Sequence, residues 1–485
     1  MTVCRHFQIR YAVLALTLLA AVAANAMTLA YEYDITREKT PTAETLRRVA
    51  DVISSLGYTQ LQLYFKDNFA YPDHPAIWRD RAHLTPEEVT AFDAYCRTKG
   101  LSLVPYQSSF GHLEPWMARE EYRTFAEHPS GRFESAEFDR AFDAAAVCPT
   151  DPRSLDFLNG LFDVLLPCFS SPYANLGCDE VWDLHATTGR SAAELREKGI
   201  GRVYLDFILK LRASLASRGK TLMFWSDIIR SYPELVKELP SDVIALDWNY
   251  EAHAPFAETT AALKAAPCRF YVCPGTSSWN SYFGRHANMR ANVSRAFRYG
   301  RKNGAEGLLL TDWGDGGYPQ PWLVSLPAIV YASVLCRTGE APSDADLAAK
   351  VDAVCGCRVG AYLIRLANAY LPVANPGSEN GTQLYRLASK PSAYRMPEHL
   401  TADDFACAVG RLRAAAALRD LSGAPDWVRD DAALLDLLVD FVSRRVAGEK
   451  GSLADAYRSR YTELWLRQNR PQGVEASVTK VFGGS

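Results

Sequence analysis

The stretch that decides the fold covers residues 28–65 and reads TLAYEYDITREKTPTAETLRRVADVISSLGYTQLQLYF. Its two ends, residues 28–34 and 59–65, are short runs of aliphatic, aromatic and β-branched residues, which predict two strands. Between them, four apolar residues recur at the i, i+3, i+4 and i+7 positions of one helical face: Leu46, Val49, Ala50 and Ile53. Gly57 stands where a helix-ending glycine is expected. The stretch therefore predicts a β–α–β unit.

The same alternation continues to about residue 340. A second helix has a strong start signal, in which Thr85 caps the helix, Pro86 occupies its first position and Glu88 completes a capping box. Gly100 marks its end. Six further runs complete a set of eight strands: 101–107, 174–178, 221–225, 243–248, 269–273 and 307–311.

Eight β/α alternations over roughly 300 residues predict a (β/α)8 TIM barrel. An open, doubly wound sheet is the alternative. No Gly-x-Gly-x-x-Gly turn follows the first strand, which weakens the nucleotide-binding version of that fold. In a barrel the active site lies at the C-terminal ends of the strands, so functional residues are expected directly after each run.

From residue 341 the strand-like runs end and Ala/Leu/Arg-rich helical stretches dominate, such as 403–421 and 432–446. Residues 376–381, PGSENG, predict a loop. We therefore expect a barrel domain over 27–340 and a helical C-terminal domain over 341–485, packed on the barrel.

Residues 1–26 have the pattern of a signal peptide. Arg5 and Arg10 precede an apolar run over 11–24, and Ala24-Asn25-Ala26 is a small-x-small cleavage site. The run is short for a transmembrane span, although an uncleaved anchor is the alternative. We expect cleavage after Ala26 and export to the periplasm or beyond.

The composition argues against several classes of function. The net charge is −3, with no basic field to attract nucleic acid. Of the 11 cysteines, only Cys355 and Cys357 form a close pair, and no histidine cluster accompanies them, so two ordinary or disulfide-paired cysteines are favoured over a metal site. Neither a His-Glu-x-x-His motif nor a Walker loop is present. We expect no metal and no cofactor.

The sharpest local motif is Asn175-Leu-Gly-Cys-Asp-Glu180, directly after a strand-like run. Adjacent carboxylates raise each other's pKa, which suits a site where one stays protonated as an acid while the other stays ionised. A solvated acidic turn is the alternative. The position at a strand end and the nearby aromatic residues favour catalysis by Asp179 and Glu180.

This motif resembles the signature of glycoside hydrolase family 20, His-x-Gly-Gly-Asp-Glu, in the hexosaminidase-D-like branch, where Cys replaces the second Gly. Asn175 stands in place of the histidine. The resemblance implies a substrate-assisted retaining mechanism, in which the acetamido oxygen of the sugar attacks the anomeric carbon. Glu180 would protonate the leaving oxygen and then deprotonate water, and Asp179 would orient the acetamido N–H.

The resemblance extends to the ends of the first three strands. Asp34-Ile-Thr-Arg37 is similar to the family's Asp-x-x-Arg element, which implies that Arg37 binds the C3 and C4 hydroxyls. A structural ion pair is the alternative for this arginine. Asp67 follows the second strand, and His112 is similar to the histidine after the third. The family then implies that Asp67 orients His112, which adjusts the pKa of Glu180.

Tryptophans end three further runs. By the same resemblance, Trp225, Trp248 and Trp313 wall a sugar pocket, and Asp315 binds the C4 and C6 hydroxyls. A core position is the alternative for any single tryptophan. The family also has a tyrosine that polarises the acetamido carbonyl, and Tyr282, after the seventh run, is the candidate here.

We therefore expect an exo-β-N-acetylhexosaminidase that removes terminal N-acetylglucosamine or N-acetylgalactosamine from an oligosaccharide or glycoconjugate. The alternatives are the same fold acting on another amino sugar, and a carbohydrate-binding barrel without turnover. No nucleic acid partner is expected, and no membrane contact beyond the signal segment. The C-terminal helices, with Trp465 and Arg470 as candidates, cover the pocket, form a homodimer contact or pack on the barrel without a further role, and the last is favoured.

Overall fold

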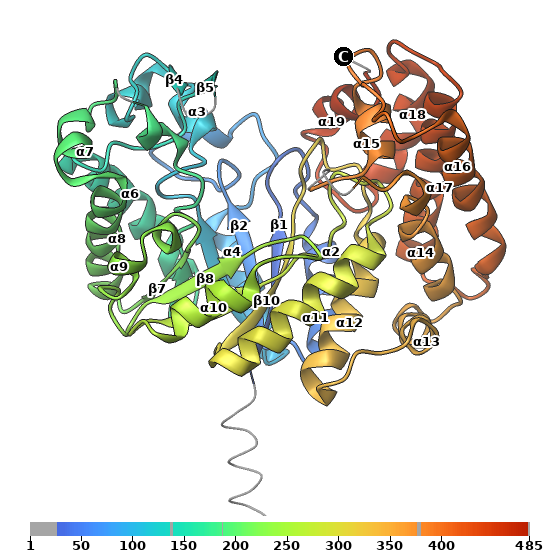
Figure 1. The fold of residues 1–485 in the computed structure, drawn as a ribbon, viewed down its shortest axis with the longest axis horizontal. Helices are drawn as coiled ribbons and strands as arrows, with labels where there is room; N and C mark the ends of the chain where they lie inside the picture. Colours follow the sequence, from blue (N-terminus) through green and yellow to red (C-terminus); the bar gives the residue numbers. More distant parts are fainter. Residues whose placement is uncertain (1–26, 136–138, 187, 376–379, 484–485) are drawn as a thin grey trace, which may run out of the picture.

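A closed barrel of eight parallel strands forms the centre of the computed structural model, which describes residues 27–135, 139–186, 188–375 and 380–483 (Figure 1). The expected signal peptide, 1–26, lies outside these residues. The barrel strands are β1 (Thr28–Asp34), β2 (Gln60–Phe65), β3 (Ser102–Gln107), β6 (Tyr173–Asn175), β7 (Thr221–Trp225), β8 (Ile244–Trp248), β9 (Arg269–Cys273) and β10 (Gly307–Asp312).

The strands follow one another around the barrel in chain order, and β10 closes it by pairing in parallel with β1, from Thr28 with Gly307 onward. All eight expected runs are strands, which confirms the barrel and excludes the open sheet. The largest difference is β6, which ends at Asn175, three residues earlier than expected. It stops there because Gly177 and Cys178 have positive φ angles of 70° and 72°, which an extended strand does not have.

The helices pack around the barrel as the apolar periodicity predicts. In α2 (Ala43–Ser55), the four residues expected on one face are all buried. In α4 (Pro86–Thr98), Thr85 and Glu88 form the expected capping box. The other helices of this ring are α6 (Pro152–Leu165), α7 (Ala192–Lys198), α8 (Ile200–Ala216), α9 (Pro233–Val236), α10 (Phe256–Lys264), α11 (His286–Asn303) and α12 (Leu326–Thr338).

A segment between β3 and β6 rises beside the upper rim of the barrel (Figure 1). It contains the short helix α5 (Glu114–Met117) and an antiparallel pair, β4 (Arg132–Ser135) and β5 (Arg140–Asp143). The sequence did not predict this hairpin. The segment forms one of the two lobes that flank the C-terminal ends of the barrel strands. A further short helix, α3 (Pro75–Trp78), follows β2.

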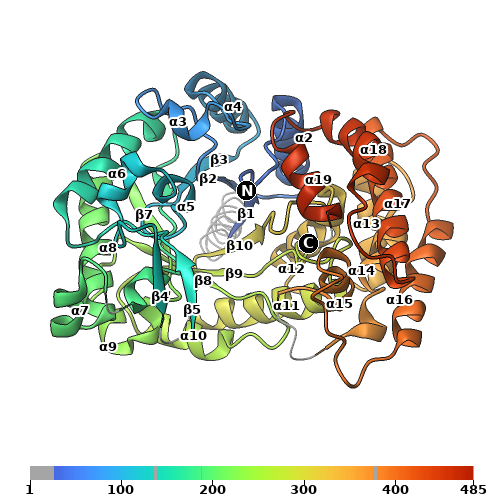
Figure 2. The ribbon, with the colours of Figure 1, turned by 90° about the horizontal axis from the view of Figure 1, so that it is seen from above.

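The second lobe consists of the C-terminal helices, as expected (Figure 2). They are α13 (Asp344–Cys355), α14 (Gly360–Ala367), α15 (Gln383–Ser389), α16 (Ala402–Ala415), α17 (Asp426–Val446), α18 (Ala454–Leu466) and α19 (Val474–Phe482). The boundary expected at residue 340 falls between α12 and α13. None of the described helices is long and apolar enough to cross a membrane.

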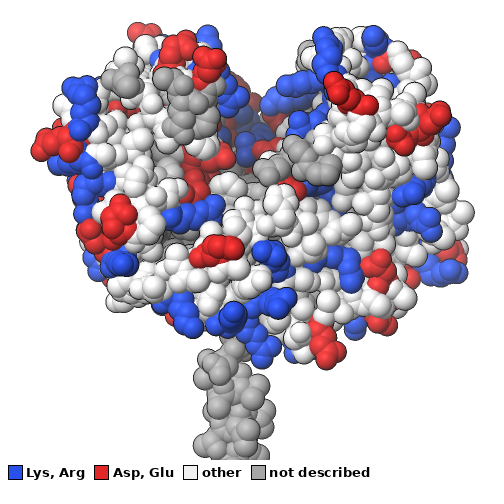
Figure 3. All heavy atoms as spheres, in the orientation of Figure 1, with Lys and Arg blue, Asp and Glu red and all other residues white. Residues whose placement is uncertain are grey.

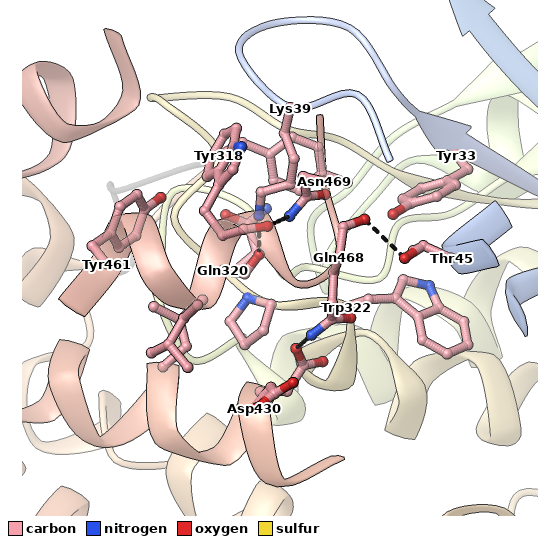
Figure 4. Close-up of a pocket in the computed structure, with 15 residues that line it drawn as sticks. Tyr33, Lys39, Thr45, Tyr318, Gln320, Trp322, Asp430, Tyr461, Gln468 and Asn469 are labelled. Atoms are coloured by element: carbon pink, nitrogen blue, oxygen red, sulfur yellow. Dashed lines mark hydrogen bonds between the residues drawn. The ribbon is translucent and has the colours of Figure 1, made fainter. Parts of the chain in front are cut away.

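The C-terminal helices pack against the barrel, and a small cavity of about 30 Å³ lies between them (Figure 4). The ammonium group of Lys39 is buried there and donates a hydrogen bond to the carbonyl of Gln320 at 2.9 Å. Burial lowers the pKa of Lys39 to about 7, although Asp431 opposes this shift. Trp465 and Arg470 also belong to this interface, since the Trp465 indole N–H donates to the Arg470 carbonyl and the Arg470 N–H to the Thr40 carbonyl. They contact the barrel at this place and do not line the cavity at the C-terminal ends of the barrel strands.

Candidate active site

Charged and aromatic side chains gather at the C-terminal ends of the barrel strands. They line a cavity of about 520 Å³, and the space-filling view shows a deep notch between the two lobes above the barrel (Figure 3). Seven of the ten predicted site residues line this cavity: Arg37, His112, Asp179, Glu180, Trp248, Trp313 and Asp315. The other three, Asp67, Trp225 and Tyr282, do not.

His112 lies between the two acids of the signature motif. Its Nε2 is 3.2 Å from Oδ2 of Asp179 and 3.4 Å from Oε2 of Glu180. Burial alone would lower the pKa of His112, but the charge of Asp179 and hydrogen bonds to Asp179, Glu114 and Glu180 raise it well above its usual value. A protonated imidazole thus offers one positive charge to two carboxyl groups.

The residue that supports His112 is Glu114, and the expectation for Asp67 is corrected. Oε1 of Glu114 lies 3.6 Å from Nδ1 of His112, and its other oxygen forms an ion pair with Lys66 at 2.6 Å. Burial would raise the pKa of Glu114, but Lys66 and His112 hold it below its usual range. Asp67 instead forms an ion pair with Arg81 at 2.9 Å, and neither residue lines the cavity.

Tight backbone packing fixes the loop that carries the two acids. A Cβ atom at Gly111 would lie 2.5 Å from the carbonyl oxygen of Asp179, so only glycine allows the histidine loop to approach this closely. Asn175 stabilises the same loop from below, because its Oδ1 accepts the N–H of Gly177 at 3.0 Å. Glu180 itself has a φ of +47°. The position of the acid is therefore set by its neighbours.

Arg37 joins the first strand to the last. Its Nε lies 3.2 Å from Oδ2 of Asp34, and its Nη2 lies 3.1 Å from Oδ1 of Asp315. The same oxygen of Asp34 accepts the backbone N–H of Gly314 at 3.0 Å. Arg37 and Asp315 keep more than a quarter of their side-chain surface exposed toward the cavity. Arg37 therefore forms ion pairs that stabilise the fold, as the alternative interpretation expected, and it also lines the cavity.

Aromatic rings form the walls, and more of them are present than the sequence predicted. Trp248 and Tyr250 stack with ring centroids 5.1 Å apart, and Tyr64 and Tyr106 stack at 4.1 Å. The remaining wall residues are Trp279 and Trp313. Such flat apolar surfaces suit the C–H faces of a sugar ring.

Trp225 supports the wall from behind instead of lining it. It is 1% exposed, and its indole N–H donates to the hydroxyl of Tyr106 at 2.8 Å. Its ring lies 6.0 Å from that of Trp313, centroid to centroid. The expectation that Trp225 contacts the sugar is therefore corrected: it positions Tyr106.

Tyr282 also lies outside the cavity. Its ring is fully buried against Tyr385 of α15 and Phe441 of α17, at centroid distances of 5.1 and 6.0 Å. The φ of +63° at Tyr282 turns its side chain toward the C-terminal helices. Tyr250, two residues after the end of β8, lines the cavity, as do Tyr64 and Tyr106. Side chains two residues apart in an extended segment lie on the same face, so the prediction for Trp248 could have been extended to Tyr250.

The C-terminal region supplies part of the cavity rim. Glu251 is held by both terminal nitrogens of Arg285, at 2.9 and 3.0 Å. It also accepts the backbone N–H of Asn380 at 2.7 Å, and the Asn380 side chain accepts the indole N–H of Trp279. The polar rim thus connects the barrel with the C-terminal lobe.

The described residues contain no group of three or more His, Cys, Asp or Glu side chains placed to hold a metal ion. In the same part of the chain, Cys355 and Cys357 are both free thiols, and neither lies in the cavity.

Residues 62–289 match the family profile described as glycosyl hydrolase family 20, catalytic domain. Human hexosaminidase D is 21% identical over 338 residues, covering 65% of this chain and 66% of that protein, so the match spans just under two thirds of this relative. The X-ray structure of Flavobacterium johnsoniae chitobiase superposes with a TM-score of 0.53 at 14% identity, covering 93% of this chain and 77% of that one. The β-N-acetylhexosaminidase from Bacteroides fragilis gives 0.51 at 18% identity, covering 68% and 69%. At these identities the two structures support the barrel fold alone.

Proposed function

Because residues 62–289 match the catalytic domain of glycosyl hydrolase family 20, we propose that this chain belongs to that family and is an exo-β-N-acetylhexosaminidase acting on terminal N-acetylglucosamine or N-acetylgalactosamine. One observation carries the proposal: Asp179 and Glu180 both lie within 3.4 Å of the same His112 nitrogen, in a cavity walled by aromatic rings. A non-catalytic sugar-binding site has no use for an acid beside an orienting carboxylate.

In the proposed first step, the acetamido oxygen of the sugar attacks its own anomeric carbon. The bond to the leaving oxygen breaks, and that oxygen takes the proton of Glu180. Asp179 accepts a hydrogen bond from the acetamido N–H and stabilises the cationic oxazolinium ring. The imidazole of His112 lies 3.2 Å from the same carboxyl group.

In the second step, the Glu180 carboxylate removes a proton from water as the water oxygen attacks the anomeric carbon. The oxazolinium ring opens and restores the acetamido group, with retention of configuration. Both steps use the same carboxyl group, so its position must serve the leaving group and the incoming water alike.

The cavity walls supply the proposed sugar contacts. The guanidinium of Arg37, with Asp315 beside it, presents donors and an acceptor to the ring hydroxyls. Tyr250 takes the role expected from the sequence for Tyr282, because Tyr250 lines the cavity and Tyr282 does not. Trp248 and Trp313 complete the walls.

The test is hydrolysis of 4-nitrophenyl N-acetyl-β-glucosaminide and the corresponding galactosaminide, beside the unacetylated glucosaminide. Release from the acetylated sugars alone, with inhibition by a thiazoline mimic of the oxazolinium, supports substrate assistance. Glu180→Gln is expected to abolish most of the release, and ordinary activity in that variant would exclude Glu180 as the acid. Sugar binding without cleavage of any hexosaminide would favour a binding barrel.

We also propose that residues 1–26 direct export and are removed after Ala26. N-terminal sequencing of protein from the periplasm or the medium should begin at Met27. An intact N-terminus in the membrane fraction would favour the anchor instead.

A further inference from the structure

Asp227 is a third carboxyl group beside the pair Asp179 and Glu180. It is the second residue after β7, and β7 pairs in parallel with β6, which leads into the loop that carries the pair. Oδ2 of Asp227 accepts the backbone N–H of Glu180 at 3.1 Å. Glu180 has a left-handed backbone, which is unfavourable for a residue with a Cβ atom and has to be held by its surroundings. The hydrogen bond from the Glu180 N–H to Asp227 stabilises this backbone conformation.

The second oxygen of Asp227 is in a different situation. Oδ1 is buried and has no hydrogen-bond partner among the residues that the structure describes. A buried, ionised carboxylate with an unpaired oxygen is costly, and carboxyl groups placed together do not all ionise at neutral pH. This oxygen is therefore the place where a proton is best held.

The charges around Asp227 agree with this placement. The titratable groups that face it are Asp179, Glu180, Arg230, Cys178 and Tyr204. Arg230 is the cation among them, but its Nη1 is bound to Asp247 at 2.6 Å. Burial, and next the charge of Asp179, raise the pKa of Asp227 to about 7, against the opposing effects of the Glu180 N–H and Arg230.

On the basis of the proposed hydrolase function, we propose that Asp227 is a positioning residue that fixes the backbone of Glu180 and shares the ionisation of the Asp179–Glu180 pair. While Asp227 is protonated, Glu180 donates its proton beside one negative charge, that of Asp179. Once Asp227 ionises, a second negative charge makes Glu180 hold its proton more strongly. We therefore expect the alkaline limb of the reaction to lie at a higher pH with Asp227 than with a neutral amide in its place.

The first arm of the test is the pH profile of kcat/KM for Asp227→Asn. The asparagine oxygen still accepts the Glu180 N–H, so only the charge is removed. The substrate is an alkyl N-acetyl-β-glucosaminide, because its leaving group needs the proton of the acid. We expect activity within about threefold of the wild type on the acidic side, and an alkaline limb about one pH unit lower. Asp227→Ala, which also removes the acceptor, should lose about tenfold or more at every pH.

The matched control is Asp183→Asn. Asp183 is also a buried carboxyl group, with a pKa raised by burial to about 6, and its Oδ1 accepts the N–H groups of Ala145 and Ala146, outside the cavity. This variant should leave the alkaline limb in place. A purely structural role for Asp227 would lower activity by one factor at every pH. An unshifted limb in Asp227→Asn therefore overturns the proposal.

The second arm does not depend on turnover. In protein with ¹³C-labelled carboxyl carbons, Asp227→Asn should remove one aspartate resonance that titrates near neutral pH and move the Glu180 midpoint down by about one pH unit. If the wild type cleaves no hexosaminide, the proposed function fails. The carboxyl titration then decides alone, and an unchanged Glu180 midpoint overturns the role of Asp227.

Discussion

Asn175 and Gln62 are joined inside the barrel by a hydrogen bond of 3.0 Å from Nδ2 of Asn175 to Oε1 of Gln62. The same asparagine accepts the N–H of Gly177, which begins the loop of the two acids. Asn175 is fully buried. The residue that departs from the family signature thus has a structural role, because it ties the loop of the two acids to β2, the next strand but one in the barrel.

Replacing Asn175 by Ala should therefore weaken both fold and catalysis. The change leaves the Gly177 N–H and the Gln62 carbonyl without partners inside the barrel, so we expect the free energy of unfolding to fall by about 3 kcal/mol. Urea denaturation measures this loss, and kcat should fall with it because the acid loop loosens. Asn303→Ala is the control, since its side chain bonds only Thr260 on the outside of the barrel. Equal losses in the two variants would contradict the special role of Asn175.

The support of His112 can be tested by comparing Glu114→Gln with Asp67→Asn. Loss of the Glu114 charge removes one of the influences that raise the pKa of His112, so the imidazole should lose its proton at a lower pH. The protonated form is favoured in the folded state, and the stability that it contributes is present below its unfolded pKa and lost as pH rises through the folded one.

The measurement is the histidine titration by NMR, together with the alkaline limb of kcat/KM. Glu114→Gln should move both to lower pH and lower kcat/KM about tenfold. Asp67→Asn should leave both unchanged, since Asp67 is paired with Arg81. If Asp67→Asn alone moved the histidine titration and the alkaline limb, Asp67 would be the residue that orients His112, as first expected from the sequence.

Two tyrosines offer a similarly matched pair. Tyr250→Phe should lower kcat about 10- to 100-fold, because it removes the hydroxyl that we propose to polarise the acetamido carbonyl. Tyr282→Phe should leave kcat unchanged, since its ring lies among Tyr385 and Phe441. Steady-state kinetics on the acetylated aryl sugar decide between them, and the reverse ranking would place the polarising group at Tyr282.

These corrections show what the sequence could and could not predict. The eight strands were recognisable because each is a short apolar run bounded by turn residues. The two acids were favoured by their position after a strand, and Arg37 by its resemblance to the family's Asp-x-x-Arg element. The hairpin of β4 and β5 was missed because each strand has four residues and pairs only with the other. The direction of a loop side chain, as in Tyr282, depends on backbone angles that no residue pattern reveals.

The buried ammonium group of Lys39 makes the joint between barrel and C-terminal helices sensitive to pH. Its folded pKa of about 7 lies below the usual lysine value, so the unfolded chain binds more protons between these values. The stability that Lys39 contributes therefore rises with pH from about 7 toward its unfolded pKa, and it is lost as pH falls through 7.

Lys39→Met removes this titration while retaining much of the apolar contact with the Tyr318 ring, over which the ammonium lies at 4.2 Å. From pH 6 to pH 8.5, the wild type should gain about 2 kcal/mol in unfolding free energy relative to the variant. Denaturant titrations at the two pH values measure the difference. Lys302→Met, on the exposed end of α11, should show no such change. A parallel pH dependence in the wild type and Lys39→Met would mean that the ammonium keeps its proton within the interface, stabilised by Asp431 across the cavity.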